Sequence, residues 1–185
     1  VERLGNGFPE AKYIDISGLL SADDFYYTDS HWRQERILKV ADEIADKMGA
    51  KRIGQCEKHD TGVSFYGVYY GQSALPHAPE RFFYLDNAVI RDLKVYNAEI
   101  KSDIPVYNLS AAAGRDPYEM FLGGAHSIIR ITNPNAEKER RLIVFRDSFG
   151  SSIAPLLTAG YSEITLVDIR YISPSSLGKL IDFTK

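Results

Sequence analysis

The sequence predicts an α/β fold with a parallel β-sheet, and three neighbouring segments support that prediction. Residues 142–145 and 164–167 are short apolar runs, the pattern of strands that are buried on both faces of a sheet. Residues 151–158 between them are typical of a short helix, which Gly160 ends. A strand, a helix and a second strand in this order form a βαβ unit, whose strands run parallel with a right-handed crossover.

The length and charge of the chain are those of one globular domain. Its 185 residues are enough to bury a sizeable core, and 44% of them are hydrophobic. We expect a single domain over residues 1–185 that belongs to a longer exported or membrane-anchored protein. The 22 basic and 25 acidic residues are scattered along the chain. Nucleic-acid binding requires a concentrated basic face, so we expect no nucleic-acid partner.

Hydrophobic periodicity predicts the other elements. Residues 32–48 carry apolar side chains at the three- and four-residue spacing of an amphipathic helix, which Gly49 ends. Tyrosines suit carbohydrate or peptide surfaces, but those in residues 63–70 alternate as on a half-buried strand, and this pattern favours a strand. We expect further strands at 12–16, 104–109 and 127–132, and loops at 72–81 and 114–124, the latter with one short helical turn.

Cysteine and histidine usage excludes several kinds of site. Cys56 is the only cysteine, so the chain forms no intrachain disulfide and no CxxC metal or redox site. No histidine and carboxylate pair has the helical spacing of a zinc site, and we expect neither a metal nor another cofactor.

No apolar run reaches the ~18 residues of a membrane span. Because the chain opens at Val1 without a methionine, we expect any membrane anchor to lie outside residues 1–185.

Ser148 is the first candidate for a catalytic side chain. It lies between the predicted strand and the predicted helix, and ligands of parallel α/β sheets bind at the carboxyl ends of the strands. Backbone N–H groups at the helix start stabilise an oxyanion in such a position. A serine there also caps helices, so this segment alone leaves both roles open. The turn lacks the GxSxG pattern, whereas its Asp-Ser start resembles that of GDSL-type hydrolases.

Asp29 and His31 form the second candidate pair. If their segment is extended, residues two apart point the same way, and Asp29 can orient the His31 imidazole and stabilise its protonated form. The alternative is that Asp29 caps the helix beginning near Ser30 and that His31 is a surface residue of its first turn. The spacing of Asp29 and His31 alone does not decide between these two interpretations.

Residues 28–32 (Thr-Asp-Ser-His-Trp) resemble the signature of the DHHW protein family and the D-x-H-W element of the related alginate O-acetyltransferases AlgJ and AlgX. Ser30 departs from the DHHW pattern, which removes any role for two adjacent histidines. The resemblance runs from about residue 20 to the end and has least support between 50 and 110. The downstream matches are residues 116–124, 129–133, 142–150, 155–157 and 167–171.

The resemblance implies a three-layer SGNH-hydrolase-like fold, flavodoxin-like, with a mainly parallel central sheet and a permuted catalytic order. It implies that Asp29 is the orienting acid, His31 the general base and Ser148 the nucleophile. It also implies that Arg170 lies near the substrate. The further candidates for oxyanion or substrate binding are Gly123, Gly124 and Tyr118.

The resemblance implies acyl transfer through an acyl-serine, with an acyl-ester or carbohydrate substrate. The expected protein is an extracytoplasmic O-acetyltransferase or acetylesterase that acts on cell-wall or exported polysaccharide. Whether a sugar hydroxyl or water accepts the acyl group stays open. The alternative is a non-catalytic, extracytoplasmic glycan-binding or scaffolding protein on the same fold.

Overall fold

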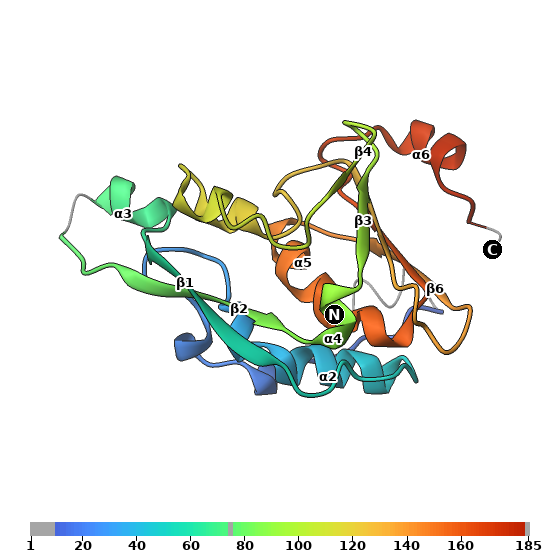
Figure 1. Ribbon diagram of the computed structural model, residues 1–185, viewed down its shortest axis with the longest axis horizontal. Coiled ribbons are helices and arrows are strands. Elements are labelled where there is room, and N and C mark those ends of the chain that lie inside the picture. The colour runs from blue at the N-terminus through green and yellow to red at the C-terminus, as the bar shows by residue number, and fades with distance from the viewer. Residues whose placement is uncertain (1–9, 74–75, 184–185) are drawn as a thin grey trace.

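The computed structural model describes residues 10–73 and 76–183, which form a mixed α/β fold with two β-sheets (Figure 1). The strands of the larger sheet come from the second half of the chain. Those of the smaller sheet precede them in sequence and extend away from the larger sheet in Figure 1. The larger sheet contains, in spatial order, β4 (Ser102–Ile104), β3 (Lys94–Asn97), β5 (Ile128–Thr132), β7 (Glu163–Val167) and β6 (Arg141–Phe145).

One pair of neighbouring strands in the larger sheet is parallel and the others are antiparallel, so the prediction of a mainly parallel sheet is wrong. The parallel pair is β6 and β7, as the βαβ unit predicts, and it is connected by α5 (Ser148–Ile153) and the 3-10 helix η6 (Ala154–Gly160). Residues 98–101 join β3 to β4. Such a short connection permits only an antiparallel hairpin, because a parallel pair needs a crossover of about a dozen residues.

The two faces of the larger sheet pack against different parts of the chain. Successive residues of a strand point to opposite faces, so Ile129 lies in the main core whereas Ile128 lies on the other face with Val167. On this second face the packing partner is Leu177 of α6 (Pro174–Leu180). The main core therefore lies on the face of the sheet that meets η6 and the N-terminal half of the chain.

The amphipathic helix predicted over residues 32–48 is confirmed in its main part. It consists of a short 3-10 turn, η3 (Gln34–Arg36), followed by α2 (Leu38–Lys47). Val40 and Ala41 of α2 are buried, as the spacing predicts, and pack in the main core. Gly49 has a φ of 60°, the left-handed conformation that lets the chain turn away after the helix.

The smaller sheet is an antiparallel pair of β1 (Glu57–Phe65) and β2 (Glu80–Asp86). The strand predicted over 63–70 is right only as far as Phe65, because the chain then forms the short helix α3 (Val68–Ser73). The prediction that the tyrosines alternate on a half-buried strand is therefore wrong. In Figure 1, α3 lies at the far end of the molecule from α6.

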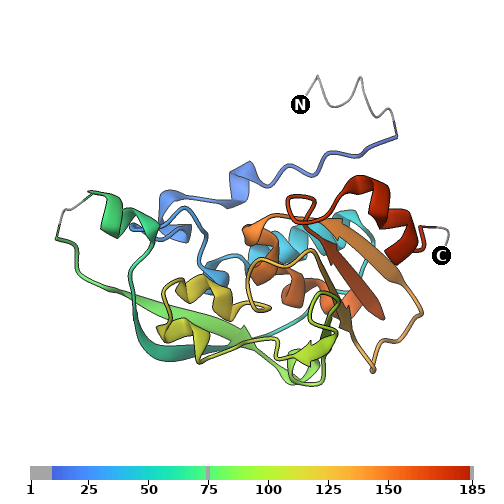
Figure 2. The ribbon, with the colours of Figure 1, turned by 90° about the horizontal axis from the view of Figure 1, so that it is seen from above.

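Two further strand predictions are also wrong. Residues 12–16 form no strand, and Figure 2 shows this N-terminal part running along the outside of the molecule. Strand β4 covers only the start of the strand predicted at 104–109.

The helical turn predicted within 114–124 is confirmed as η5 (Pro117–Met120). The remaining short helices are η1 (Ser17–Leu19), η2 (Ala22–Asp24), α4 (Ala88–Arg91) and η4 (Ala111–Ala113).

Truncation of Leu166 tests the position of the core. This side chain is fully buried in β7, so Leu166→Ala is expected to lower the free energy of unfolding by about 2–5 kcal/mol. Leu109→Ala is the matched control, because Leu109 is half-exposed and its loss is expected to change stability by less than about 0.5 kcal/mol. Urea unfolding measures both. Equal effects of the two substitutions would contradict the assignment of the core.

Candidate active site

Three polar side chains from distant parts of the sequence meet at the start of α5. The Ser148 hydroxyl oxygen lies 2.7 Å from His31 Nε2, and His31 Nδ1 lies 2.5 Å from Asp29 Oδ1. Asp29 and His31 lie in the loop before η3, whereas Ser148 is the first residue of α5. Ser148 is half-buried, and the side chains of His31 and Asp29 are 13% and 4% exposed. These distances and this order of contacts match a Ser-His-Asp triad.

The Asp29 carboxylate is surrounded by hydrogen-bond donors. Its Oδ1 accepts from the backbone N–H of His31 at 2.9 Å as well as from the ring, and its Oδ2 accepts from the Val68 N–H at 3.1 Å. Burial raises the pKa of this carboxyl, but the hydrogen bonds from His31 and Val68 outweigh it and hold the pKa below its ordinary value. An ionised Asp29 keeps the proton of His31 on Nδ1, so that Nε2 is free to accept the Ser148 proton.

A tight turn, rather than an extended segment, brings Asp29 to His31. Phe25 and Trp32 form an isolated antiparallel bridge, and the Tyr26 N–H donates to the His31 carbonyl at 3.1 Å. The condition that the segment is extended is therefore not met, although the two side chains do meet. The capping alternative is wrong as well, because η3 and α2 begin further along the chain and Asp29 caps neither.

Thr28 joins this turn to the smaller sheet. Its N–H and hydroxyl donate to Glu80 Oε2 at 3.2 and 3.1 Å, and Arg33 forms an ion pair with the other carboxylate oxygen of Glu80. The Gly67 N–H donates to the Thr28 hydroxyl at 3.0 Å. A Cβ atom on Gly67 would lie 2.2 Å from the Thr28 carbonyl oxygen and 2.4 Å from Asp29 Cβ. Only glycine therefore lets the chain after β1 come this close to the Asp29 turn.

Aromatic side chains hold the His31 ring. The Tyr118 ring stacks on it with 3.9 Å between ring centroids and an angle of 15° between the planes. The Tyr118 hydroxyl donates to Ser152 Oγ at 2.7 Å, and Trp32 Nε1 donates to the same oxygen at 2.8 Å. Burial raises the pKa of the Tyr118 hydroxyl, which keeps it a donor. Because Tyr118 is buried and its hydroxyl is used in the core, its ring supports His31, and its role in substrate binding stays a prediction.

Asp147, and not Ser148, caps α5. The Asp147 side chain accepts from the Phe149 N–H at 3.0 Å, and this is the side-chain bond of an N-cap. The helix-capping alternative for Ser148 is therefore wrong. Ser148 occupies the first helical position, where its hydroxyl meets His31 and its N–H has no acceptor within the helix.

Arg146 links the turn before Ser148 to two neighbouring segments. Its buried guanidinium donates to Ser151 Oγ at 2.9 Å and to the carbonyls of Gly124 and His126 at 3.2 and 3.3 Å. Asp168 Oδ2 lies 4.0 Å from Arg146 Nη1 and balances its charge. The Gly123–Gly124 loop is thereby fixed against the Ser148 turn.

The backbone and side-chain hydrogen bonds of Gly123, Gly124 and Arg170 bear on their predicted roles in oxyanion or substrate binding. The Gly124 N–H donates to the Phe121 carbonyl at 3.1 Å, so it is not free to bind an oxyanion. Gly123 has a φ of 72° in the same loop. Arg170 donates through two nitrogens to Asp168, at 2.9 and 2.6 Å, and the Arg170 side chain is half-exposed. In the described part of the chain, neither glycine nor Arg170 is hydrogen-bonded to Asp29, His31 or Ser148.

A groove of about 490 Å³ borders the Ser148 turn. It lies between α5 and the carboxyl ends of β6 and β7, the end of the βαβ unit at which a ligand is expected. Both sequence neighbours of Ser148, Asp147 and Phe149, line the groove, and Arg170 lines it as well. Among the described residues, those that line the groove do not include Ser148, His31 or Asp29, so the groove places open space and the Arg170 cation beside the Ser148 turn and not at the triad side chains themselves.

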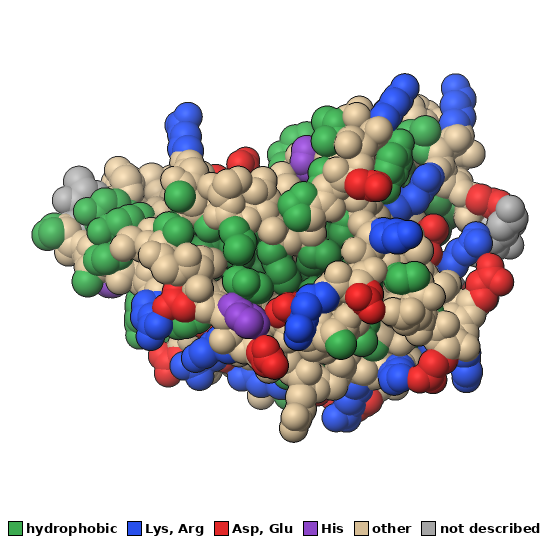
Figure 3. All heavy atoms as spheres, in the orientation of Figure 1, with side chains coloured by type: hydrophobic (Ala, Val, Ile, Leu, Met, Phe, Trp, Pro, Cys, Tyr) green, Lys and Arg blue, Asp and Glu red, His purple; other side chains and the backbone are tan. Residues whose placement is uncertain are grey.

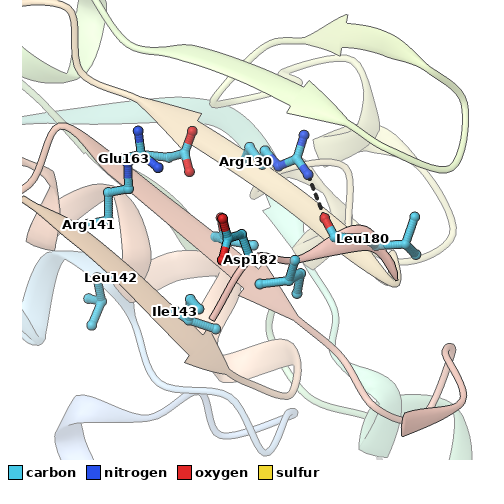
Figure 4. Close-up of a pocket in the computed structure, with 9 residues that line it drawn as sticks. Arg130, Arg141, Leu142, Ile143, Glu163, Leu180 and Asp182 are labelled. Atoms are coloured by element: carbon cyan, nitrogen blue, oxygen red, sulfur yellow. Dashed lines mark hydrogen bonds between the residues drawn. The ribbon is translucent and has the colours of Figure 1, made fainter. Parts of the chain in front are cut away.

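A second hollow, of about 240 Å³, lies on the face of the larger sheet that points away from the main core (Figure 4). Arg130 there donates to the Leu180 carbonyl at 2.9 Å. Arg141 and Glu163 also line the hollow, but no serine, cysteine or histidine does. It therefore offers no nucleophile or general base of those types.

Within residues 10–73 and 76–183, no three His, Cys, Asp or Glu side chains gather where they could hold a metal ion. No helix of that part of the chain is long and apolar enough to cross a membrane. Burial raises the pKa of the Cys56 thiol to about 11, so this cysteine is not a thiolate nucleophile at neutral pH.

The family model described as DHHW protein matches residues 20–167. The chain belongs to the DHHW protein family. Similar solved structures are a DHHW family protein from Eubacterium siraeum, with 21% identity and a TM-score of 0.65, and Bacillus cereus PatB1 with a sulfonyl adduct, with 18% identity and a TM-score of 0.62. A comparison with curated protein sequences finds no significant match.

The two similar structures establish the fold of this DHHW protein. Each match covers 85% of this chain, but only 55% of the Eubacterium siraeum protein and 57% of PatB1. The present chain thus spans little more than half the length of either protein. The DHHW resemblance predicted from the sequence is confirmed by the family match.

Several residues that build the site of this DHHW protein were not predicted from the sequence. Gly67 had a signal, since a lone glycine within an alternating segment indicates close approach of another backbone. Glu80, Arg146 and Ser152 had none, because their roles depend on segments that are distant in sequence.

Two glycine substitutions test the contact between Gly67 and the Asp29 turn. Gly67→Ala forces its new methyl group into the Thr28 carbonyl and is expected to lower the free energy of unfolding by about 1–3 kcal/mol. Gly71→Ala in α3 is the control, because a Cβ there meets nothing within 4 Å and alanine favours a helix. Urea unfolding compares them. A Gly67→Ala protein as stable as Gly71→Ala would contradict the close approach.

Asp29→Asn tests the charge on Asp29. At neutral pH the loss of charged hydrogen bonds is expected to reduce the free energy of unfolding by about 1.5–3 kcal/mol. Because the folded-state pKa lies below the ordinary 3.8, the stabilising effect of Asp29 is present above that pH and disappears as the pH falls below it. The stability difference between the two proteins should therefore shrink in acid. A constant difference from pH 7 into acid would show that the charge contributes nothing.

Proposed function

We propose that this DHHW protein transfers an acyl group through an acyl-serine at Ser148, as an O-acetyltransferase or acetylesterase of cell-wall or exported polysaccharide. The observation that carries the proposal is the continuous hydrogen-bond chain from Asp29 through His31 to Ser148. The buried carboxylate, the oriented imidazole and the half-buried hydroxyl have the environments that these three roles require.

The first half-reaction forms the acyl-serine. Ser148 Oγ attacks the carbonyl carbon of the ester donor while His31 Nε2 takes the hydroxyl proton. The new bond is Oγ–C, and the bond that breaks joins the carbonyl carbon to the leaving alcohol oxygen. The protonated His31, stabilised by the Asp29 carboxylate, returns the proton to that alcohol.

The second half-reaction releases the acyl group. A sugar hydroxyl or water loses its proton to His31 and attacks the acyl carbon, and Ser148 Oγ leaves and recovers the proton. The two acceptors differ only in which hydroxyl reaches the acyl-serine. The Ser148 N–H, free within the helix, is one donor to the oxyanion formed in both steps. Gly123 is the remaining loop candidate for the second donor, since Gly124 uses its N–H elsewhere.

Similar proteins support the proposal. PatB1, which shares the fold, has been solved with a sulfonyl adduct, and sulfonyl reagents react with activated nucleophiles. The D-x-H-W element resembles that of AlgJ and AlgX, which implies an SGNH-hydrolase-like origin of the site and a role for Arg170 near the substrate. An extracytoplasmic location, with any membrane anchor outside residues 1–185, belongs to the same proposal.

Hydrolysis of p-nitrophenyl acetate tests the nucleophile. Ser148→Ala is expected to lower kcat/KM by about a thousandfold or more, because no covalent intermediate can form. Ser102→Ala, an exposed serine of β4 outside the site, is the matched control and should retain the parent rate. Equal rates for the parent and Ser148→Ala would exclude Ser148 as the nucleophile and favour the non-catalytic alternative.

The same variants can be labelled with phenylmethanesulfonyl fluoride. Ser148 Oγ should form a bond to sulfur with loss of fluoride, and peptide mass spectrometry should find the adduct on Ser148 in the parent and Ser102→Ala proteins.

Product analysis with an acetyl donor and a glycan separates acetyl transfer from hydrolysis. An acetylated sugar indicates transfer, and free acetate alone indicates hydrolysis.

A further inference from the structure

Four exposed tyrosines lie on the two chain segments that meet at the Asp29 turn, and we call them the tyrosine surface: Tyr27, Tyr66, Tyr69 and Tyr70. Their exposed fractions are 68%, 40%, 46% and 37%, which are large values for aromatic side chains. The Tyr66 and Tyr70 rings lie 4.6 Å apart, and Tyr27 lies 6.0 Å from the ring of His77. Figure 3 shows hydrophobic side chains gathered at the end of the molecule where α3 lies.

The backbone holds this surface against the candidate active site. The Tyr69 N–H donates to the Thr28 carbonyl at 2.9 Å, which places α3 beside Tyr27. The neighbouring Val68 N–H donates to Asp29 Oδ2, the carboxylate that orients His31. One segment therefore presents exposed rings outward while its backbone contacts the orienting acid of the triad.

The segment that carries three of these rings has no charge. Residues 61–79 contain no Asp, Glu, Lys or Arg, although these types make up 25% of the chain. A binding surface for nucleic acid or for an acidic polymer would need cationic side chains. The composition instead suits a ligand that is uncharged where it touches the protein.

We propose that the tyrosine surface binds an uncharged stretch of a polysaccharide chain and holds it beside the triad as the acyl acceptor. The acceptor role rests on the proposed acyl transfer at Ser148, whereas the binding itself does not. A pyranose ring has apolar C–H faces that pack on an aromatic ring, and its hydroxyls can bond to the tyrosine hydroxyls. Tyrosine rings have few rotatable bonds, so they lose little conformational entropy when a sugar packs on them.

Chitohexaose and cellohexaose are the probes, because both are uncharged sugar chains. Calorimetric titration should use Ser148→Ala protein, so that binding is measured without turnover. Adding Tyr69→Ala and Tyr70→Ala is expected to raise the Kd of the bound probe by about tenfold or more. Alanine favours the helical conformation of α3, and an unchanged urea midpoint should verify folding.

Tyr13→Ala in the same Ser148→Ala protein is the matched control, because Tyr13 is an exposed tyrosine outside the surface and should leave the Kd unchanged. The Kd should also be the same at low and high salt, since no charge pairs form. Failure of both probes to bind, or an equal effect of Tyr13→Ala, would overturn the proposal. So would tyrosine-dependent dimerisation in sedimentation, or tyrosine-dependent flotation with phosphatidylglycerol vesicles, which would identify a second copy or a lipid surface as the occupant.

The two proposals fail in different measurements. If the parent protein does not hydrolyse p-nitrophenyl acetate although the probe binds, the acyl-transfer proposal is overturned and the sugar-binding proposal is retained. Turnover that depends on Ser148, together with no probe binding, would overturn the sugar surface alone.

Discussion

The buried carboxylate of Asp29 is the constraint on which the rest of the site depends. A carboxylate that is removed from water is costly unless several donors replace its hydration. Here the donors are the ring and backbone N–H of His31 and the N–H of Val68. To supply them, the chain must turn tightly before Trp32 and must bring the segment after β1 onto that turn. The smaller sheet is therefore part of the architecture of the candidate site.

Helix α5 completes the arrangement from the other side. Ser148 and Ser152 are four residues apart and lie on one face of the helix, so both point toward the Asp29 turn. Ser148 meets the His31 ring, and Ser152 accepts from the two aromatic side chains, Trp32 and Tyr118, that pack around it. Ser148 and the side chain that supports the packing around His31 are thus positioned by the same short helix.

The sequence predicted best where the chain folds locally. The amphipathic helix was found because its apolar residues repeat with the period of a helix, and the βαβ unit was found because two short apolar runs flank a short helical segment. The prediction over 63–70 failed because an alternating aromatic pattern is also compatible with a strand end followed by a short, exposed helix. The mainly parallel sheet failed because a single βαβ unit fixes one strand pair and says nothing about the others.

By itself, the sequence determined the DHHW family and identified Asp29, His31 and Ser148 as the residues to examine, through motifs and their order along the chain. Only the tertiary structure decided that these side chains touch, that Tyr118 supports the His31 ring, and that Gly67 must be glycine. Contacts of this kind join segments many residues apart. They depend on strand pairing and helix packing, which a local pattern of side chains does not encode.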